Sequence, residues 1–154
     1  MTQGRARHYD PMETPQPLTF ALEDSPDEVA QATLRAGLSA HSAELGLPGD
    51  WTPRWILGRA PDGTVQAGIL FLTTFDWLFV HLLWVAEPYR RQGIGSRLIK
   101  DVEAVARERN CRGAYVDTFT FQAPKFYERL GYREFGRLED FPPGHSRIWL
   151  AKMF

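Results

Sequence analysis

The chain has little cysteine, almost no net charge and no long apolar run, and each of these features excludes a class of protein. Cys111 is the single cysteine among 154 residues, which excludes an internal disulfide and a cysteine-rich zinc site. The 18 basic and 19 acidic residues leave a formal net charge of -1, whereas a general nucleic-acid or anionic-membrane binder needs a basic surplus. The most apolar run, Trp77 to Ala86, is interrupted by His81. It is about half as long as the ~20 residues that a membrane helix needs.

The remaining composition suits one globular domain. Hydrophobic residues make up 44% of the chain, which is enough to bury a core. The first 17 residues contain Pro11, Pro15 and Pro17 and no apolar stretch, so we expect a flexible arm over 1–17 rather than a secretory signal. We expect the domain to span 18–154 and the protein to be cytoplasmic, because the chain shows no targeting pattern and no disulfide framework.

Local patterns predict an α+β architecture with strands of mixed direction. Ser25 is expected to cap a helix, with Pro26 at its first position and Glu28 completing a capping box. An amphipathic helix is expected from Ile94, where apolar residues begin to recur at helical spacing. A short helix is expected over 123–130. The expected strands are 18–23, 55–60, 65–74, 77–86, 114–119, 132–137 and 147–152.

A glycine-containing turn between a predicted strand and a predicted helix has the features of a pyrophosphate-binding cradle. Gly93 and Gly95 let the backbone approach a ligand closely, and the helix start behind them presents unpaired N–H groups. Arg90 and Arg91 precede the turn and add positive charge. The turn is neither a Walker loop, because no Gly-Lys-Ser/Thr follows, nor a Rossmann fingerprint, because the third glycine is absent.

Two motifs in order along the chain resemble those of the GNAT superfamily of N-acetyltransferases. Val85 through Ser96, with Arg90-x-x-Gly93-x-Gly95 opening a helix, is similar to the acetyl-CoA motif of that family. The segment 123–132 resembles its second signature, Ala-x-x-Phe-Tyr-x-x-x-Gly-Phe/Tyr. The element order matches over nearly the whole chain. The resemblance therefore implies a GNAT fold, which is a single domain with a splayed, mixed central β-sheet flanked by helices.

The same resemblance implies acetyl-CoA as cosubstrate and no metal. Pantetheine would enter where the parallel strands 79–86 and 114–119 diverge. Many members carry Asn three residues before the Ala of the second motif; Thr120 stands there in this chain, so Gln122 either replaces that hydrogen bond or only caps the helix. The expected cofactor-binding residues are Leu83, Trp84, Val85, Arg90, Arg91, Gln92, Gly93, Ile94, Gly95, Ser96 and Gln122.

Three side chains are candidates for proton transfer. The resemblance places Tyr127 at the family's general-acid position, where its hydroxyl would protonate the leaving sulfur. His81 interrupts an apolar strand and is the first candidate for the general base, while Glu87 at the strand end is the weaker one. A strict period of two places His81, Leu83 and Val85 on one face of that strand.

The predicted activity is acetyl transfer from acetyl-CoA to a primary amine of a small molecule or peptide, by direct attack in a ternary complex. A catalytically silent acyl-CoA-binding or sensing module is the alternative, and a domain that binds another pyrophosphate is a third. The acidic segment 18–76, with a local net charge of -5 from eight acids and three Arg, suggests a cationic acceptor. We expect neither nucleic acid nor membrane as a partner, and the resemblance allows a homodimer.

Overall fold

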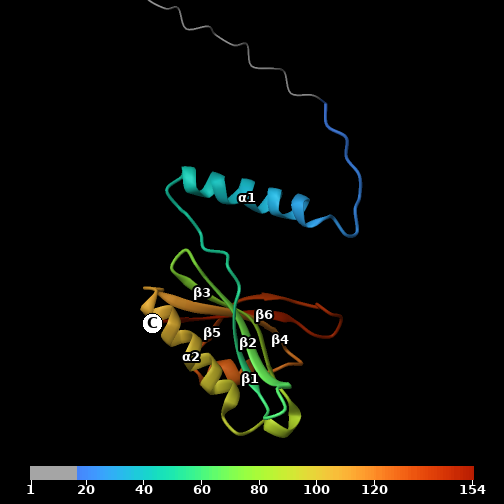
Figure 1. The fold of residues 1–154 in the computed structure, drawn as a ribbon. Helices are drawn as coiled ribbons and strands as arrows, with labels where there is room; N and C mark the ends of the chain where they lie inside the picture. The colour runs from blue at the N-terminus through green and yellow to red at the C-terminus, as the bar shows by residue number, and fades with distance from the viewer. Residues whose placement is uncertain (1–16) are drawn as a thin grey trace, which may run out of the picture.

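A six-stranded sheet forms the centre of the molecule (Figure 1). The computed structural model describes residues 17–154, so the expected N-terminal arm lies, except for its last residue, outside the described residues. The strand order is β1-β2-β3-β4-β6-β5, and β3 with β4 is the one parallel pair. The strands are β1 (Arg54–Arg59), β2 (Val65–Thr74), β3 (Trp77–Val85), β4 (Gly113–Phe119), β5 (Arg133–Leu138) and β6 (Arg147–Met153). This topology confirms the predicted α+β fold with a mixed sheet.

The helices are α1 (Glu28–Glu44), the short 3-10 helix η1 (Glu87–Tyr89), α2 (Ile94–Glu108) and α3 (Pro124–Arg129). Each helix that the sequence predicts is present, and the strand bounds from β1 onward agree with the predicted ones to within about two residues, the usual uncertainty of helix and strand ends. None of the helices in residues 17–154 has the length and hydropathy that a membrane span requires.

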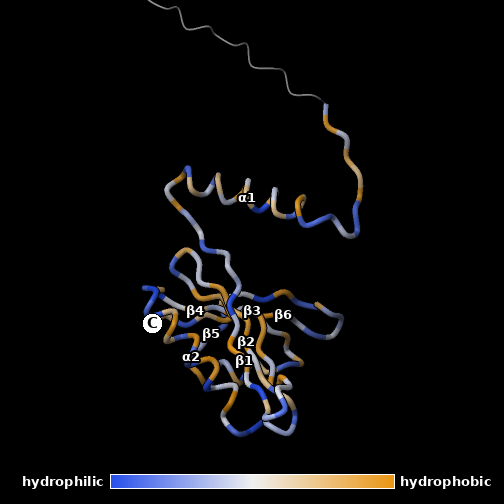
Figure 2. The backbone as a smooth tube through the Cα atoms, viewed as in Figure 1, coloured by the Kyte–Doolittle hydropathy of each residue, from blue (hydrophilic) through white to orange (hydrophobic). Residues whose placement is uncertain are grey.

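Helix α2 packs its apolar face on one side of the sheet. Apolar side chains at helical spacing along α2 meet alternate residues of the central strands, and Figure 2 shows hydrophobic segments gathered in these strands. The fully or almost fully buried members of this core include Ile69, Leu78, Val80, Ile99, Val102, Ala106, Ala114, Val116 and Leu150. Cys111 also lies in this core, and burial raises the pKa of its thiol, which makes a nucleophilic role unfavourable.

The sheet opens between its two parallel strands. The pairing of β3 with β4 ends at Val80 and Val116, although β3 continues to Val85 and β4 to Phe119. Beyond this point the backbone groups of the two strands face a gap instead of each other. The structure therefore contains the splay that the resemblance implies.

A β-bulge at His81 changes which side chains face the core. Leu70 pairs with Leu82 while Phe71 pairs with Val80, so His81 is an extra residue without a partner on β2. As a result Val80 lies in the core and Leu83 packs against it, whereas His81 is exposed. The strict alternation expected from the sequence, which put His81 and Leu83 on one face, is therefore wrong.

Helix α1 differs most from its prediction. Asp27, not Ser25, is the N-cap, and its carboxylate accepts a hydrogen bond from the Ala30 amide at 2.7 Å. No residue of α1 is buried, and Figure 1 shows the helix apart from the sheet that α2 covers. The predicted strand at 18–23 does not form, and no strand among residues 17–154 pairs with this segment.

A buried carboxylate joins three distant parts of the fold. Glu103 on α2 is 3% exposed and accepts two hydrogen bonds from the Lys152 ammonium, both at 2.9 Å. The Tyr132 hydroxyl donates to the same carboxylate at 3.1 Å, and Arg107 lies 3.6 Å away. These contacts tie α2 to β6 and to the segment after α3, which carries the second motif.

Candidate active site

The loop between η1 and α2 forms the predicted cradle. Gly93 caps α2 in a left-handed conformation with φ 78°, and Arg91 also has a positive φ of 60°. Within the described residues no hydrogen bond engages the amides of 91–96, so their N–H groups are available to an anion. The Arg90 side chain braces the loop, because its Nε donates to the Val85 carbonyl oxygen at 2.9 Å.

A cavity of about 550 Å³ lies in front of these amides. It is bounded by the end of β3, the first turn of α2 and the start of α3. The lining suits a phosphate-rich ligand with a long polar arm, because the helix start offers N–H donors and β3 offers backbone groups that are not paired with β4. The lining residues are Leu83, Trp84, Val85, Tyr89, Arg90, Arg91, Gly93, Ile94, Gly95, Ser96, Ala123, Phe126 and Arg129.

Most of the predicted cofactor-binding residues therefore line one cavity, and the exceptions are two glutamines. Gln92 turns back to the loop, and its side-chain amide donates to the Pro88 carbonyl oxygen at 2.9 Å. The Gln122 carbonyl oxygen accepts from the Thr118 hydroxyl at 2.8 Å and from the Phe119 amide at 3.1 Å. Because these two donors occupy its oxygen, Gln122 could offer a cofactor only its NH2 group. The Thr120 hydroxyl is also engaged, since it accepts from the Ser146 amide at 3.0 Å.

Gly95 provides a test of how closely a ligand approaches the cradle. A Cβ built at Gly95 lies 3.4 Å from the Phe126 ring, which is just tolerable, but the added methyl occupies the wall of the cavity. We expect Gly95→Ala to stabilise the fold by about 0.5 kcal/mol, because alanine favours helix. We also expect the added methyl group to weaken coenzyme A binding about tenfold, because crowding of a closely packed contact costs ~1–3 kcal/mol. Thermal unfolding and calorimetric titration with coenzyme A measure the two effects.

The matched control for this change is Gly37→Ala. Gly37 lies inside α1, and a Cβ there meets nothing within 4 Å. This variant should gain stability and bind coenzyme A normally. Unchanged affinity in the Gly95 variant would remove Gly95 from the proposed binding surface.

Tyr127 sits at the edge of the core, next to the cradle. Its side chain is 7% exposed and packs edge-on against the rings of Phe126 and Tyr132, 5.0 and 5.9 Å away between centroids. Burial, helped by the charge of Asp117, raises the pKa of Tyr127 to about 12. No hydrogen bond within residues 17–154 engages its hydroxyl. The phenol therefore stays protonated at neutral pH, as a general acid must.

His81 and Glu87 lie at separate places on the rim. His81 is exposed on the bulge of β3, and its ring meets Phe79 edge-on at 5.5 Å. Glu87 opens η1 after the strand end and is exposed. His81 lines a second cavity of about 600 Å³, whereas Glu87 lines neither this cavity nor the one at the cradle.

This second cavity is on the sheet face opposite α2. Its walls come from α1, the segment before β1, and those side chains of β2 and β3 that alternate with the core residues. The lining residues are Arg35, Leu38, Ser39, Trp51, Pro53, Leu70, Leu72, Phe79 and His81. Of these, the sequence analysis proposed a role for His81 alone. The alternation in β2 could have indicated the strand residues, but no local signal places Arg35 or Trp51 beside them.

Two ion-pair clusters fix the surroundings of the sheet opening and of the second cavity. Arg147 on β6 donates to Asp117 on β4 at 2.7 Å, and its guanidinium lies over the Phe119 and Trp149 rings. Asp50, before β1, accepts from the Thr52 amide and is paired with Arg54 at 2.6 Å, which holds its pKa well below the usual range. It is also 3.4 Å from Arg109 at the end of α2, so the segment between α1 and β1 is tied to α2.

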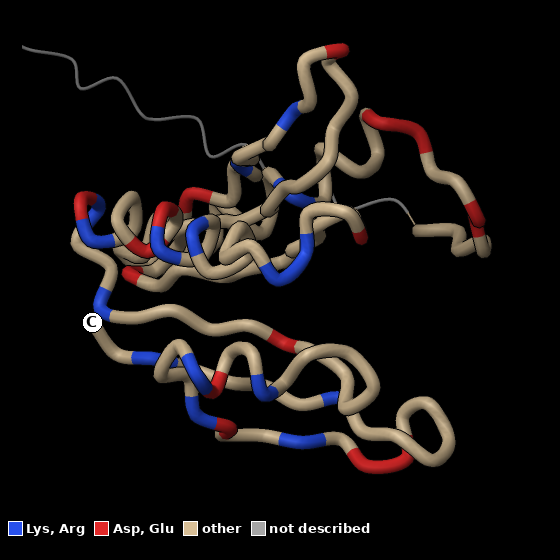
Figure 3. Tube along the Cα trace, turned by 90° about the horizontal axis from the view of Figure 1, so that it is seen from below, with Lys and Arg blue, Asp and Glu red and all other residues tan. Residues whose placement is uncertain are grey.

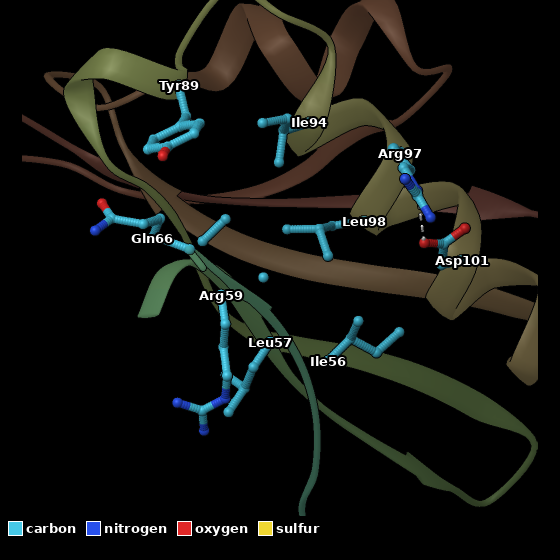
Figure 4. A pocket seen from close by; sticks show the side chains of 12 residues that line it. Ile56, Leu57, Arg59, Gln66, Tyr89, Ile94, Arg97, Leu98 and Asp101 are labelled. Carbon is cyan, nitrogen blue, oxygen red and sulfur yellow. Dashed lines mark ion pairs between the residues drawn. The ribbon is translucent and has the colours of Figure 1, made fainter. Parts of the chain in front are cut away.

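A smaller cavity of about 280 Å³ adjoins the cradle (Figure 4). Tyr89 and Ile94 line both cavities, and Figure 4 shows Leu98 and Ile56 below them, with Arg97 facing Asp101 at 3.6 Å. None of the predicted catalytic residues lines it. In the view of Figure 3, basic and acidic residues are interspersed along the chain. The part of the chain that the structure describes contains no cluster of acidic, histidine and cysteine residues suited to a metal.

Comparisons with known proteins agree with this arrangement. The sequence profile of the Acetyltransferase (GNAT) family matches residues 19–132. An acetyltransferase of Agrobacterium fabrum is 36% identical over 137 residues, which cover 89% of this chain and all of that protein. Blasticidin-S acetyltransferase of Streptomyces morookaense is 45% identical over 91 residues, 58% of this chain and 67% of its own. The crystal structure of an acetyltransferase from Bacillus cereus superposes with a TM-score of 0.72 at 28% identity, covering 87% of this chain and 98% of the other. The chain therefore belongs to the GNAT family of acetyltransferases.

Proposed function

We propose that this acetyltransferase moves the acetyl group of acetyl-CoA to a primary amine of a small molecule or peptide. The proposal rests on one arrangement: the cradle cavity and the cavity beside His81 lie on opposite faces of the sheet, and β3 borders both where it leaves β4. Pantetheine threaded through the opening would bring its thioester from the first cavity to the second. An amine held in the second cavity would then face the thioester carbonyl carbon.

Each proposed step has a group on the chain to carry it out. The free amides of 91–96 would hold the pyrophosphate, with Arg90 and Arg91 adding charge. The unpaired backbone N–H groups of β3 beyond Val80 would stabilise the tetrahedral oxyanion. As the amine nitrogen bonds to the carbonyl carbon and the C–S bond breaks, His81 would take the amine proton and Tyr127 would give a proton to the sulfur.

The position of His81 favours it over Glu87 as the base, and substitution distinguishes the two. We expect His81→Ala to lower kcat about hundredfold, within the range of general base catalysis. Glu87→Gln should retain most of the activity, because Glu87 lines neither cavity. The assay incubates each variant with acetyl-CoA and a panel of amines, and follows both the free thiol and the amide product. A large loss in the Glu87 variant alone would reverse the assignment.

The alternative of a silent binding module gives a different result in the same assay. Such a module would bind coenzyme A through the cradle and release no thiol above the background rate with any amine. The second cavity beside His81 favours an enzyme, because a module that only binds acyl-CoA needs no cavity for an acceptor.

A further inference from the structure

The cavity beside His81 has an apolar, aromatic wall. Phe79 stacks on Tyr115, with ring centroids 4.7 Å apart and planes 11° from parallel, and meets His81 edge-on. Trp51 also lines the cavity, and its ring meets that of Phe75 edge-on with centroids 5.5 Å apart. Leu70, Leu72, Leu38 and Pro53 complete the apolar lining. Flat faces of this kind favour an apolar or aromatic ring over a flexible polar chain.

Charge in this cavity has the opposite sign to that of the surrounding segment. Arg35 and His81 are the ionisable side chains among the described lining residues, and no Asp or Glu of the described chain lines the cavity. Arg35 has no carboxylate within ion-pair distance among residues 17–154, where its guanidinium donates one hydrogen bond, to the Gln31 side-chain oxygen at 3.4 Å. Arg54, Arg109, Arg137 and Arg147 are paired with acids, whereas Arg91, Arg112 and Arg133, like Arg35, have no ion pair within residues 17–154. Among these unpaired arginines, Arg35 is the one that lines this cavity. An unpaired guanidinium at the mouth of an apolar cavity suits a carboxylate.

We propose that the acceptor is an amine with a flat aromatic body and a carboxylate, held with its ring between Trp51 and Phe79 and its carboxylate on Arg35. This inference rests on the proposed function, because it places the amine at His81. It replaces the cationic acceptor that the acidic segment 18–76 suggested, since the acids of that segment do not line the cavity.

The test compares acceptors that differ in one feature. 4-(Aminomethyl)benzoate has the amine, the ring and the carboxylate; 4-(aminomethyl)benzamide loses only the charge, 6-aminohexanoate loses only the ring, and spermidine represents a cationic acceptor. For the wild type we expect kcat/KM for the benzoate to exceed that for the benzamide about tenfold to hundredfold, the range of a charge-assisted hydrogen bond. The linear amino acid and spermidine should be poorer than the benzoate.

Arg35→Gln should abolish the preference for the benzoate and leave the benzamide unchanged. Arg35 is exposed on a helix with no buried residues, so the variant should fold. Arg112→Gln is the matched control, because Arg112 is exposed, lines none of the described cavities and should keep the preference. Equal use of benzoate and benzamide by the wild type, a preference that survives in the Arg35 variant, or a preference for spermidine would each overturn the inference.

A binding measurement separates this inference from the proposed function. With coenzyme A present, the benzoate should bind the wild type more tightly than the Arg35 variant, as followed by ligand-observed NMR. Binding that depends on Arg35 without any turnover would support the ligand class and contradict the acetyl-transfer proposal. Turnover of spermidine without an Arg35-dependent preference would support acetyl transfer and contradict the ligand class. If the benzoate bound to neither protein, the proposed ligand class would also be overturned.

Discussion

Tyr127→Phe should lower kcat about hundredfold or more, with little change in KM for acetyl-CoA. Removal of a general acid typically costs a factor of about 10² to 10⁴. Burial holds the pKa of Tyr127 at about 12, so the phenol is protonated throughout the range in which the enzyme can be assayed. Loss of activity on its ionisation should therefore not appear below about pH 10. Steady-state kinetics over pH 6 to 10 measures both expectations.

Tyr132→Phe is the matched control, because both tyrosines are buried in one aromatic cluster and differ in the partner of their hydroxyl. The Tyr132 hydroxyl donates to Glu103, whereas no partner for the Tyr127 hydroxyl occurs in residues 17–154. Loss of a hydrogen bond to a buried carboxylate costs ~1.5–3 kcal/mol, so the Tyr132 variant should lose stability and keep kcat. The Tyr127 variant should keep its stability and lose kcat. Full activity in Tyr127→Phe with a good acceptor would exclude Tyr127 as the acid.

Glu103→Ala should destabilise the fold by about 3 kcal/mol. Removing one partner of a buried ion pair typically costs ~3–5 kcal/mol, and the lower end applies because the Lys152 side chain is 26% exposed and can reach water. The change also leaves the Tyr132 hydroxyl without its acceptor. Urea unfolding followed by circular dichroism measures the free energy of unfolding. Glu108→Ala, on the same helix but exposed, should change it by less than about 0.5 kcal/mol.

A double variant separates the loss of a charge pair from the loss of packing. Glu103→Leu combined with Lys152→Met replaces the pair with apolar side chains of similar size, which is often close to neutral in stability. We expect it to recover part of what Glu103→Ala loses, because the Lys152 charge is gone while the Tyr132 hydroxyl still lacks its acceptor. A double variant as unstable as Glu103→Ala would show that the unpaired Lys152 charge is not the source of the loss, which would then come from the missing contacts of Glu103, including its hydrogen bond from Tyr132.

The sequence predicted best where local patterns and long-range packing agree. Helix α2 has apolar residues at helical spacing and does bury them, and strands β4 and β6 alternate between buried and partly exposed residues over most of their length and do pair. Leu18 to Glu23 also alternates, but alternation specifies a strand only where a partner exists, and the edge of β1 remains unpaired. At α1 two acceptable caps compete, and the carboxylate of Asp27 lies in position to reach the Ala30 amide.

The candidate site was predictable where it depends on neighbours in sequence. The cradle at 91–96 is a local motif, and the structure has Gly93 in the left-handed conformation at the start of α2, as the motif predicts. The bulge at His81 could not be predicted, because it arises from the register between β2 and β3 rather than from either strand alone. The same holds for Arg35 and Trp51, which line one cavity with Phe79 only in the folded chain.

The central claim is that coenzyme A binds in the cradle and reaches through the sheet toward His81. Amide NMR spectra of the labelled protein, recorded during a titration with coenzyme A, test it most directly. The account predicts that the largest shifts fall on the amides of 91–96 and on β3 beyond Val80, with smaller changes at Arg35 and Trp51. Shifts confined to the cavity lined by Leu57, Arg97 and Asp101, or no saturable shift at all, would contradict it.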